Sequence, residues 1–132
     1  MLSLMRRMGI DYGTKRVGIA LTDASGTMAF PHDTLVNDDT LLEQVAALAQ
    51  EKEVGEVIIG ESLTLAGVPN AVQQHIDAFA AALRETLAVP VHLVPEQFST
   101  QAALREQGRT AHTDASAAAL ILDTYLTKQN RD

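Results

Sequence analysis

The chain has 132 residues, of which 46% are apolar, and carries a formal net charge of −7 at neutral pH. This length predicts one domain over residues 1–132 with room for an apolar core. The negative charge argues against broad, non-specific adhesion to nucleic acid, because such binding needs many cations to neutralise phosphates. It leaves room for a nuclease, since a carboxylate-rich metal site is itself acidic.

The chain contains no cysteine, which excludes disulfides and thiolate zinc sites. No apolar run approaches the roughly 20 residues that a membrane-spanning helix needs, and the first residues lack the pattern of a signal peptide. We therefore expect a cytoplasmic protein with no membrane partner. The sequence makes no prediction of oligomeric state.

The first third of the chain predicts three antiparallel strands. They cover about Arg6–Asp11, Arg16–Asp23 and Thr27–Val36. Pro31 interrupts the third strand, which places it at an edge of the sheet. In the turn between the first two strands, Gly13 permits a positive φ or a close backbone approach.

The rest of the chain alternates helices and strands. Thr40–Glu43 has the pattern of a capping box at the start of a helix, and Val57–Ile59 is typical of a strand buried on both faces. Pro69 opens a second helix, and Val91–Val94 forms a second buried strand. A short helix between Ser99 and Gly108 and a last helix with an apolar stripe from Ala118 to Leu126 follow. This order predicts an α/β fold: a mixed five-stranded sheet, antiparallel first and then joined by parallel crossovers, with helices on both faces.

A carboxylate stands at the end of the first strand, directly before two cations. Asp11 is followed by Gly13, Thr14, Lys15 and Arg16. An acid on a rigid strand end, beside backbone N–H groups and two cations, suits a metal ion or a phosphate. The plainer alternative is that Asp11 only caps the turn.

Three more acids are predicted at the ends of elements. Glu61 follows the Val57–Ile59 strand, Glu96 follows the Val91–Val94 strand, and Asp114 opens the final helix. Each has a plainer explanation, such as a helix-start charge for Asp114 or a solvated loop position for Glu96. Since the chain has 17 acidic residues, their spacing alone does not identify a site.

Over nearly its whole length the chain resembles the YqgF/RuvX family of ribonuclease H-like proteins. The residues that carry the resemblance are Gly9–Ala20, Val57–Gly60, Leu63, Gly67, Val91–Val94, Asp114–Leu122, Tyr125 and Leu126. The first of these blocks and the C-terminal block together make the match specific.

This family is described as Holliday-junction resolvases and as nucleases that mature the 5′ end of pre-16S rRNA. The resemblance implies a ribonuclease H-like fold in which Asp11, Glu96 and Asp114 form the catalytic, metal-binding set for Mg²⁺ or Mn²⁺. It implies a metal-dependent endonuclease that hydrolyses phosphodiester bonds in pre-rRNA during ribosome biogenesis, or in branched DNA. Lys15, Arg16 and the turn at Gly13 and Thr14 would then hold a phosphate.

The chain departs from the family at two places. The usual Asp-Glu-Arg is Pro95-Glu96-Gln97 here, so one acid is kept and a cation is lost. The usual Gly-Leu-Pro-Leu-Asn is Gly60–Thr64, in which Glu61 is either an additional metal ligand or a plain loop acid. These changes keep a second hypothesis open: a catalytically silent member that binds RNA or ribosome-assembly factors through the same surface.

Two further questions stay open at the level of sequence. Asp11–Thr14 also resembles the first phosphate loop of actin-like and sugar-kinase ATP-binding proteins, but those need two related domains and this length supplies one. The sequence also does not decide between RNA and DNA as the substrate. Because the net charge is negative, either nucleic acid would have to bind to a local basic patch. Its candidate residues are Lys15, Arg16, Arg105 and Arg109, with Arg6 and Arg7.

Overall fold

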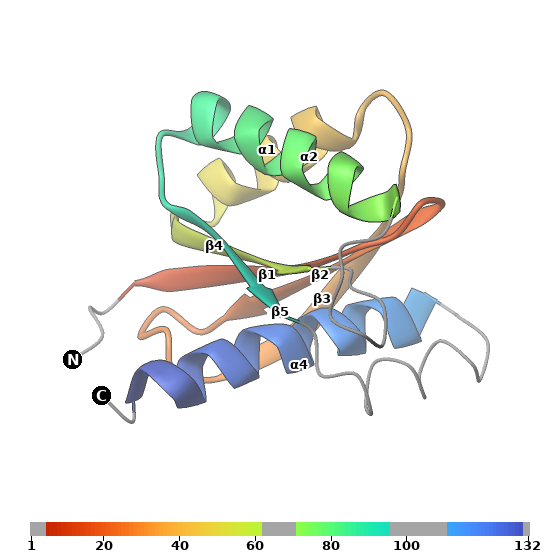
Figure 1. The fold of residues 1–132 in the computed structure, drawn as a ribbon. Helices are drawn as coiled ribbons and strands as arrows, with labels where there is room; N and C mark the ends of the chain where they lie inside the picture. The colour runs from red at the N-terminus through yellow and green to blue at the C-terminus, as the bar shows by residue number, and fades with distance from the viewer. Residues whose placement is uncertain (1–4, 62–70, 96–110, 131–132) are drawn as a thin grey trace.

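A computed structural model describes residues 5–61, 71–95 and 111–130. Five strands form one sheet in the order β3-β2-β1-β4-β5. Helices α1 and α2 cover one face of this sheet and α4 crosses the other (Figure 1). The predicted α/β architecture, with a mixed five-stranded sheet between helices, is confirmed.

The strands combine an antiparallel meander with two parallel crossovers. Strands β1 (Arg6–Tyr12), β2 (Arg16–Thr22) and β3 (Ala29–Val36) pair antiparallel. Strands β4 (Val54–Glu61) and β5 (Val91–Pro95) extend the sheet in parallel with β1. The carboxyl ends of β1, β4 and β5 therefore lie at the same end of the sheet.

Three helices are described. The crossovers from β3 to β4 and from β4 to β5 contain α1 (Leu41–Glu51) and α2 (Ala71–Leu87), and α4 (Ala111–Asn130) follows later. The helix expected between Ser99 and Gly108 falls outside the described residues. Within the described ranges, no helix is long and apolar enough to cross a membrane.

The alternation of side chains along β1 divides the core into two parts. Met8 and Ile10 point toward α1 and α2, in the larger apolar cluster, while Gly9 and Asp11 point toward α4. The smaller cluster lies under α4 and contains Ala20, Ile58, Ala118, Ile121, Leu122 and Leu126. The apolar side chains predicted to form a stripe on α1, on α2 and on α4 are the ones that pack against the sheet in these two clusters.

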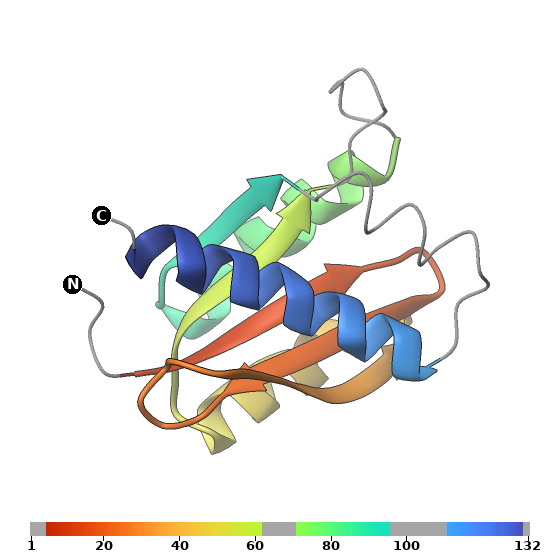
Figure 2. The same ribbon diagram turned by 90° about the horizontal axis from the view of Figure 1, so that it is seen from below.

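Two glycines allow α4 to lie directly on the sheet. A Cβ atom built on Gly18 would stand 1.9 Å from the carbonyl oxygen of Asp114, and one on Gly9 would stand 2.7 Å from that of Ala118. Both contacts are with helix backbone, which cannot move aside as a flexible side chain can. Figure 2 shows α4 running across the strands from this closely packed end. The backbone of Asp114 is therefore held against β2.

A partly buried polar network lies under the other end of α4. Glu56 Oε1 accepts a hydrogen bond from Arg7 Nε at 2.6 Å, and Glu56 Oε2 lies 2.9 Å from His92 Nε2 and accepts from the Tyr125 hydroxyl at 3.1 Å. Burial, followed by the neighbouring Glu56 charge, raises the pKa of Tyr125 to about 12, so the phenol keeps its proton and remains a donor. Arg7 is 2% exposed, and its suggested place in a nucleic-acid patch is therefore wrong.

Three local expectations are also corrected. Thr40 makes no capping bond, because Asp38 Oδ1 already accepts from its N–H and hydroxyl and its backbone is helical. Strand β5 is at an edge of the described sheet, so Val91 is buried but the next three residues are only half-buried. The turn at Gly13 does not use a positive φ, since Gly26 is the only glycine with one among the described residues. The expected edge position of the Pro31 strand, β3, is confirmed.

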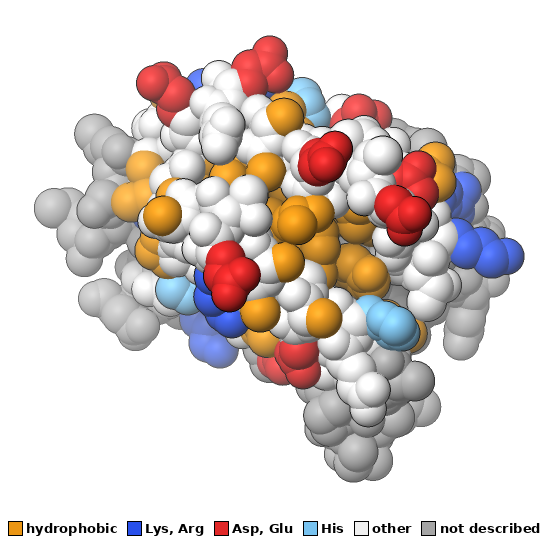
Figure 3. Space-filling view, turned by 90° about the horizontal axis from the view of Figure 1, so that it is seen from above, with side chains coloured by type: hydrophobic (Ala, Val, Ile, Leu, Met, Phe, Trp, Pro, Cys, Tyr) orange, Lys and Arg blue, Asp and Glu red, His pale blue; other side chains and the backbone are white. Residues whose placement is uncertain are grey.

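The face made by α1 and α2 carries much of the negative charge. Figure 3 shows acidic side chains spread over this face, around exposed parts of apolar ones. Exposed acids on the two helices include Glu43, Glu51, Asp77 and Glu85. Such exposed acids repel a polyanion, so nucleic acid is not expected to lie across the outer surfaces of α1 and α2 themselves.

The close contact at Gly18 gives a stability prediction. Gly18→Ala should lower the free energy of unfolding by about 2 kcal/mol or more, because the new methyl group overlaps rigid backbone. Gly55→Ala is the matched control, since its Cβ would meet the flexible Met5 side chain, with the sulfur at 2.9 Å. Urea unfolding of both variants measures the difference. Equal stabilities would show that α4 does not rest on Gly18 in solution.

Candidate functional site

Asp11 is held inside the protein near the carboxyl end of β1. Its side chain is 1% exposed, and its cross-strand partner is Gly18 on β2. Because directly paired residues present their side chains on the same face of a sheet, Asp11 points to the side on which α4 packs. Its burial differs from the solvent exposure expected of a simple turn cap.

Asp114 reaches the same place from the first turn of α4. Its side chain is 0% exposed, and its backbone covers Gly18, the partner of Asp11. Two acids separated by about a hundred positions in the sequence thus lie on one face, at one end of the sheet. This supports the predicted convergence of Asp11 and Asp114.

A cation compensates part of this buried charge. Arg16 Nε lies 2.9 Å from Asp114 Oδ2, and the Arg16 side chain is 37% exposed. Arg16 is the first residue of β2, directly after the turn. Its position shows that the space beside Asp114 accommodates positive charge.

The turn between β1 and β2 is fixed by Asn37. The Asn37 side chain donates to the carbonyl oxygen of Gly13 at 2.8 Å, and its backbone N–H donates to that of Lys15 at 2.9 Å. Gly13 is buried, whereas Thr14 and Lys15 are exposed. The turn therefore presents the Lys15 side chain to solvent from a constrained backbone.

Of the other two predicted acids, the structure describes only Glu61, and it does not bring Glu61 into this group. Glu61 ends β4 and is half-buried, but alternation places it on the face of Ile59, opposite to that of Asp11. Glu96 lies outside the described residues. Within the described residues no three potential ligands form a metal-binding group, so Asp11 and Asp114 are the part of the predicted set whose positions are known.

Sequence reasoning missed the elements that position these acids. It did not identify Gly18 as the contact point of α4 or Arg16 as the partner of Asp114. It also missed the network around Glu56, although a charged residue inside the apolar strand Val54–Glu61 is a usable signal for a buried ion pair.

Nearly the whole sequence matches a protein family. The profile of RuvX, described as Holliday junction resolvase, covers residues 5–128. A protein of Oleidesulfovibrio alaskensis named "Putative pre-16S rRNA nuclease" is 37% identical over 92% of this chain and 92% of its own length. A protein of Anaeromyxobacter with the same name is 38% identical over 92% of this chain and 96% of its own.

Solved structures support the fold independently of sequence. Thermus thermophilus RuvC in complex with a Holliday junction matches with a TM-score of 0.62 at 14% identity, over 96% of both chains. Fowlpox virus resolvase with its Holliday junction DNA matches with a TM-score of 0.60 at 13% identity, over 95% of this chain and 99% of that one. Together with the sequence matches, these similarities show that the chain belongs to the RuvX/YqgF family and has the ribonuclease H-like fold of the resolvases.

Proposed function

We propose that the protein is a metal-dependent endonuclease that hydrolyses phosphodiester bonds in structured nucleic acid, with the 5′ leader of pre-16S rRNA as its substrate. The observation that carries this proposal is the burial of Asp11 and Asp114 on one face at one end of the sheet. Family membership and the names of the relatives support the substrate class.

The residues present fit a divalent cation. Asp11 and Asp114 supply hard oxygen donors inside the protein, and Arg16 already places a positive charge beside Asp114. We propose that Asp11 and Asp114 hold Mg²⁺ or Mn²⁺ together with Glu96. When bound, such ions activate water and stabilise the leaving oxygen of a phosphodiester.

The remaining residues have separate tasks in this proposal. Arg16 compensates Asp114 and keeps its carboxylate oriented toward the face that Asp11 shares. The exposed Lys15 contacts a substrate phosphate from the turn that Asn37 fixes. The packing of α4 on Gly18 excludes water from the carboxylates on the side of the core.

Two alternatives are separated from the proposal by one assay. The family description and the resolvase-like fold favour four-way DNA junctions as a second candidate substrate. The departure at Pro95-Glu96-Gln97 favours a catalytically silent, RNA-binding protein. A pre-16S 5′-leader RNA and a four-way DNA junction should be incubated side by side with Mg²⁺, with Mn²⁺ and with EDTA. Cleavage of RNA that EDTA abolishes supports the proposal, and binding without cleavage of either substrate contradicts it.

Asp11→Asn tests the catalytic role. It removes one of two neighbouring buried carboxylates while preserving shape, so it should lower the cleavage rate about 100-fold or more. The free energy of unfolding without metal should stay within about 1 kcal/mol of the wild type. Mg²⁺ should raise the melting temperature of the wild type but not of this variant.

Asp123→Asn is the matched control for this test, because Asp123 is exposed on the same helix as Asp114. It should leave both the cleavage rate and the stabilisation by Mg²⁺ unchanged. Full cleavage by Asp11→Asn would end the catalytic assignment, and a large loss of metal-free stability would show that Asp11 is structural.

Lys15 and Arg16 should respond differently to substitution. Lys15→Ala should reduce the slope of log K against log salt by about 0.7–0.9, as expected for one lost phosphate contact, with unchanged stability. Arg16→Ala should cost about 1–2 kcal/mol of stability, because it leaves Asp114 buried without this cation; partial exposure of Arg16 limits the loss. Binding at graded salt and urea unfolding measure the two effects. If the salt slope of Lys15→Ala were unchanged, Lys15 would not contact a substrate phosphate and would only be a solvated surface residue.

A further inference from the structure

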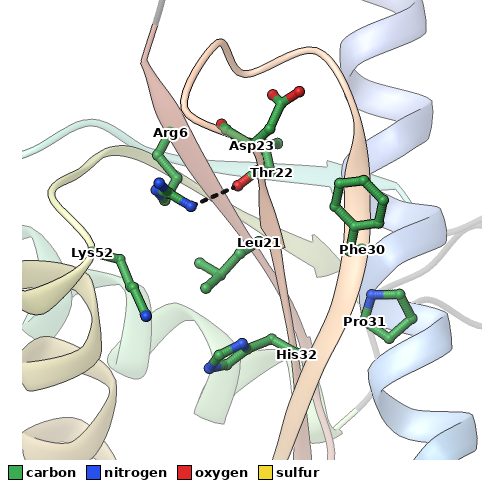
Figure 4. Close-up of a pocket in the computed structure, with 8 residues that line it drawn as sticks. All are labelled: Arg6, Leu21, Thr22, Asp23, Phe30, Pro31, His32 and Lys52. Carbon is green, nitrogen blue, oxygen red and sulfur yellow. Dashed lines mark hydrogen bonds between the residues drawn. The ribbon is translucent and has the colours of Figure 1, made fainter.

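A hollow with basic side chains lies away from the acidic site. It has a volume of about 240 Å³ and lies between the start of β1, the end of β2, the first half of β3 and the C-cap of α1. The residues that line it are Arg6, Leu21, Thr22, Asp23, Phe30, Pro31, His32 and Lys52 (Figure 4). Arg6 is five residues before Asp11 on β1, about 16 Å along the strand, so the hollow and the acidic site are distinct.

Three basic side chains enter this hollow from different elements. Figure 4 shows Arg6, His32 and Lys52 arranged around Leu21. Arg6 is held by a hydrogen bond from its Nη1 to the carbonyl oxygen of Thr22 at 3.2 Å. His32 is the extra residue of a β-bulge, since the register of β2 with β3 shifts between Ile19 and Ala20, and a bulge redirects a side chain.

The positive charge of the hollow is only partly compensated. No carboxylate of the described residues forms an ion pair with Arg6 or Lys52. Asp23 also lines the hollow, but its Oδ1 accepts hydrogen bonds from Ser25 Oγ and from the backbone N–H groups of Gly26 and Thr27. The lining thus keeps a net positive charge on a protein whose total charge is −7. Such local concentration of like charge favours a bound anion.

An exposed aromatic ring completes the hollow. Phe30 is 49% exposed, although a large apolar side chain on a strand is ordinarily buried. Cations that contact a phosphate, next to an aromatic ring on which a base stacks, are the two components of surfaces that bind single-stranded nucleic acid.

We infer that this hollow binds one nucleotide of a single-stranded segment of nucleic acid, with the phosphate among Arg6, Lys52 and His32 and the base on Phe30. The inference rests on the proposed function for its assumption that this strand belongs to the substrate. The hollow then holds the strand at a distance from the scissile bond and adds affinity without touching the reacting atoms.

Binding of a labelled 12-nucleotide single-stranded RNA in EDTA, followed by fluorescence anisotropy at graded salt, tests this inference. Lys52→Ala should weaken binding about threefold or more and reduce the salt slope by about 0.7, the loss of one phosphate contact on a single strand. Lys128→Ala is the matched control, because Lys128 is also a lysine near a helix end, is exposed, and does not line the hollow. Arg6→Gln serves as a second variant and should behave as Lys52→Ala.

Phe30→Ala separates stacking from charge. It should weaken binding about fivefold or more while leaving the salt slope unchanged, because it removes no charge. Equal effects of Lys52→Ala and Lys128→Ala would overturn the inference. A second pair of results would also overturn it. If inorganic phosphate shifted the NMR signals of Thr22 and His32 while RNA affinity did not depend on Lys52, the hollow would bind a small anion and not the RNA strand.

The same assay keeps this inference distinct from the proposed function. In EDTA no cleavage occurs, so the dependence of RNA affinity on Lys52 is measured without the acidic site. Asp11→Asn should retain that dependence. If the wild type cleaved no substrate and still bound RNA with an affinity that depends on Lys52, that result would contradict the proposed function and support RNA binding in the hollow.

Discussion

The site depends on the contact between the backbone of α4 and the glycines of β1 and β2. Gly18 places the first turn of α4 directly on the strand that pairs with β1, and Gly9 lets the next turns stay close. With side chains at these positions, the helix would have to stand farther from the sheet. Asp114 would then stand farther from the face onto which Asp11 projects, so the missing Cβ atoms keep the start of α4 against that face.

This arrangement carries an electrostatic cost that the protein offsets locally. Two carboxylates are almost fully buried, and burial disfavours their charged forms unless a counter-charge is near. Arg16 supplies one at 2.9 Å from Asp114. At the other end of α4, Glu56 accepts hydrogen bonds from Arg7 and Tyr125, and these anchor the helix to β1 and β4. The helix is thus fixed at both ends, by backbone contact beside the acids and by polar contacts far from them.

The sequence was informative wherever the signal was local. The continuous apolar run Val57–Ile59 and helical stripes such as that ending in Leu126 located strands and helices, because these patterns depend only on which side chains are buried. The partner of Arg16, the burial of Arg7 and the orientation of Glu61 away from Asp11 depend instead on how distant elements pack. A single sequence does not show which distant residues pair, and the capping pattern at Thr40 failed because Asp38 competes for the same groups.

The most direct test of this account is paramagnetic broadening by Mn²⁺ in the NMR spectrum of the metal-free protein. If Asp11 and Asp114 bind the ion together, substoichiometric Mn²⁺ should first broaden the amide signals of Asp11, Gly18 and Ala115, which come from three elements that meet only in the folded protein. Broadening should be weaker at Arg7 and Tyr125, under the far end of α4. Broadening centred on other acids, such as Asp23 or Asp38, with these signals unaffected would contradict the account.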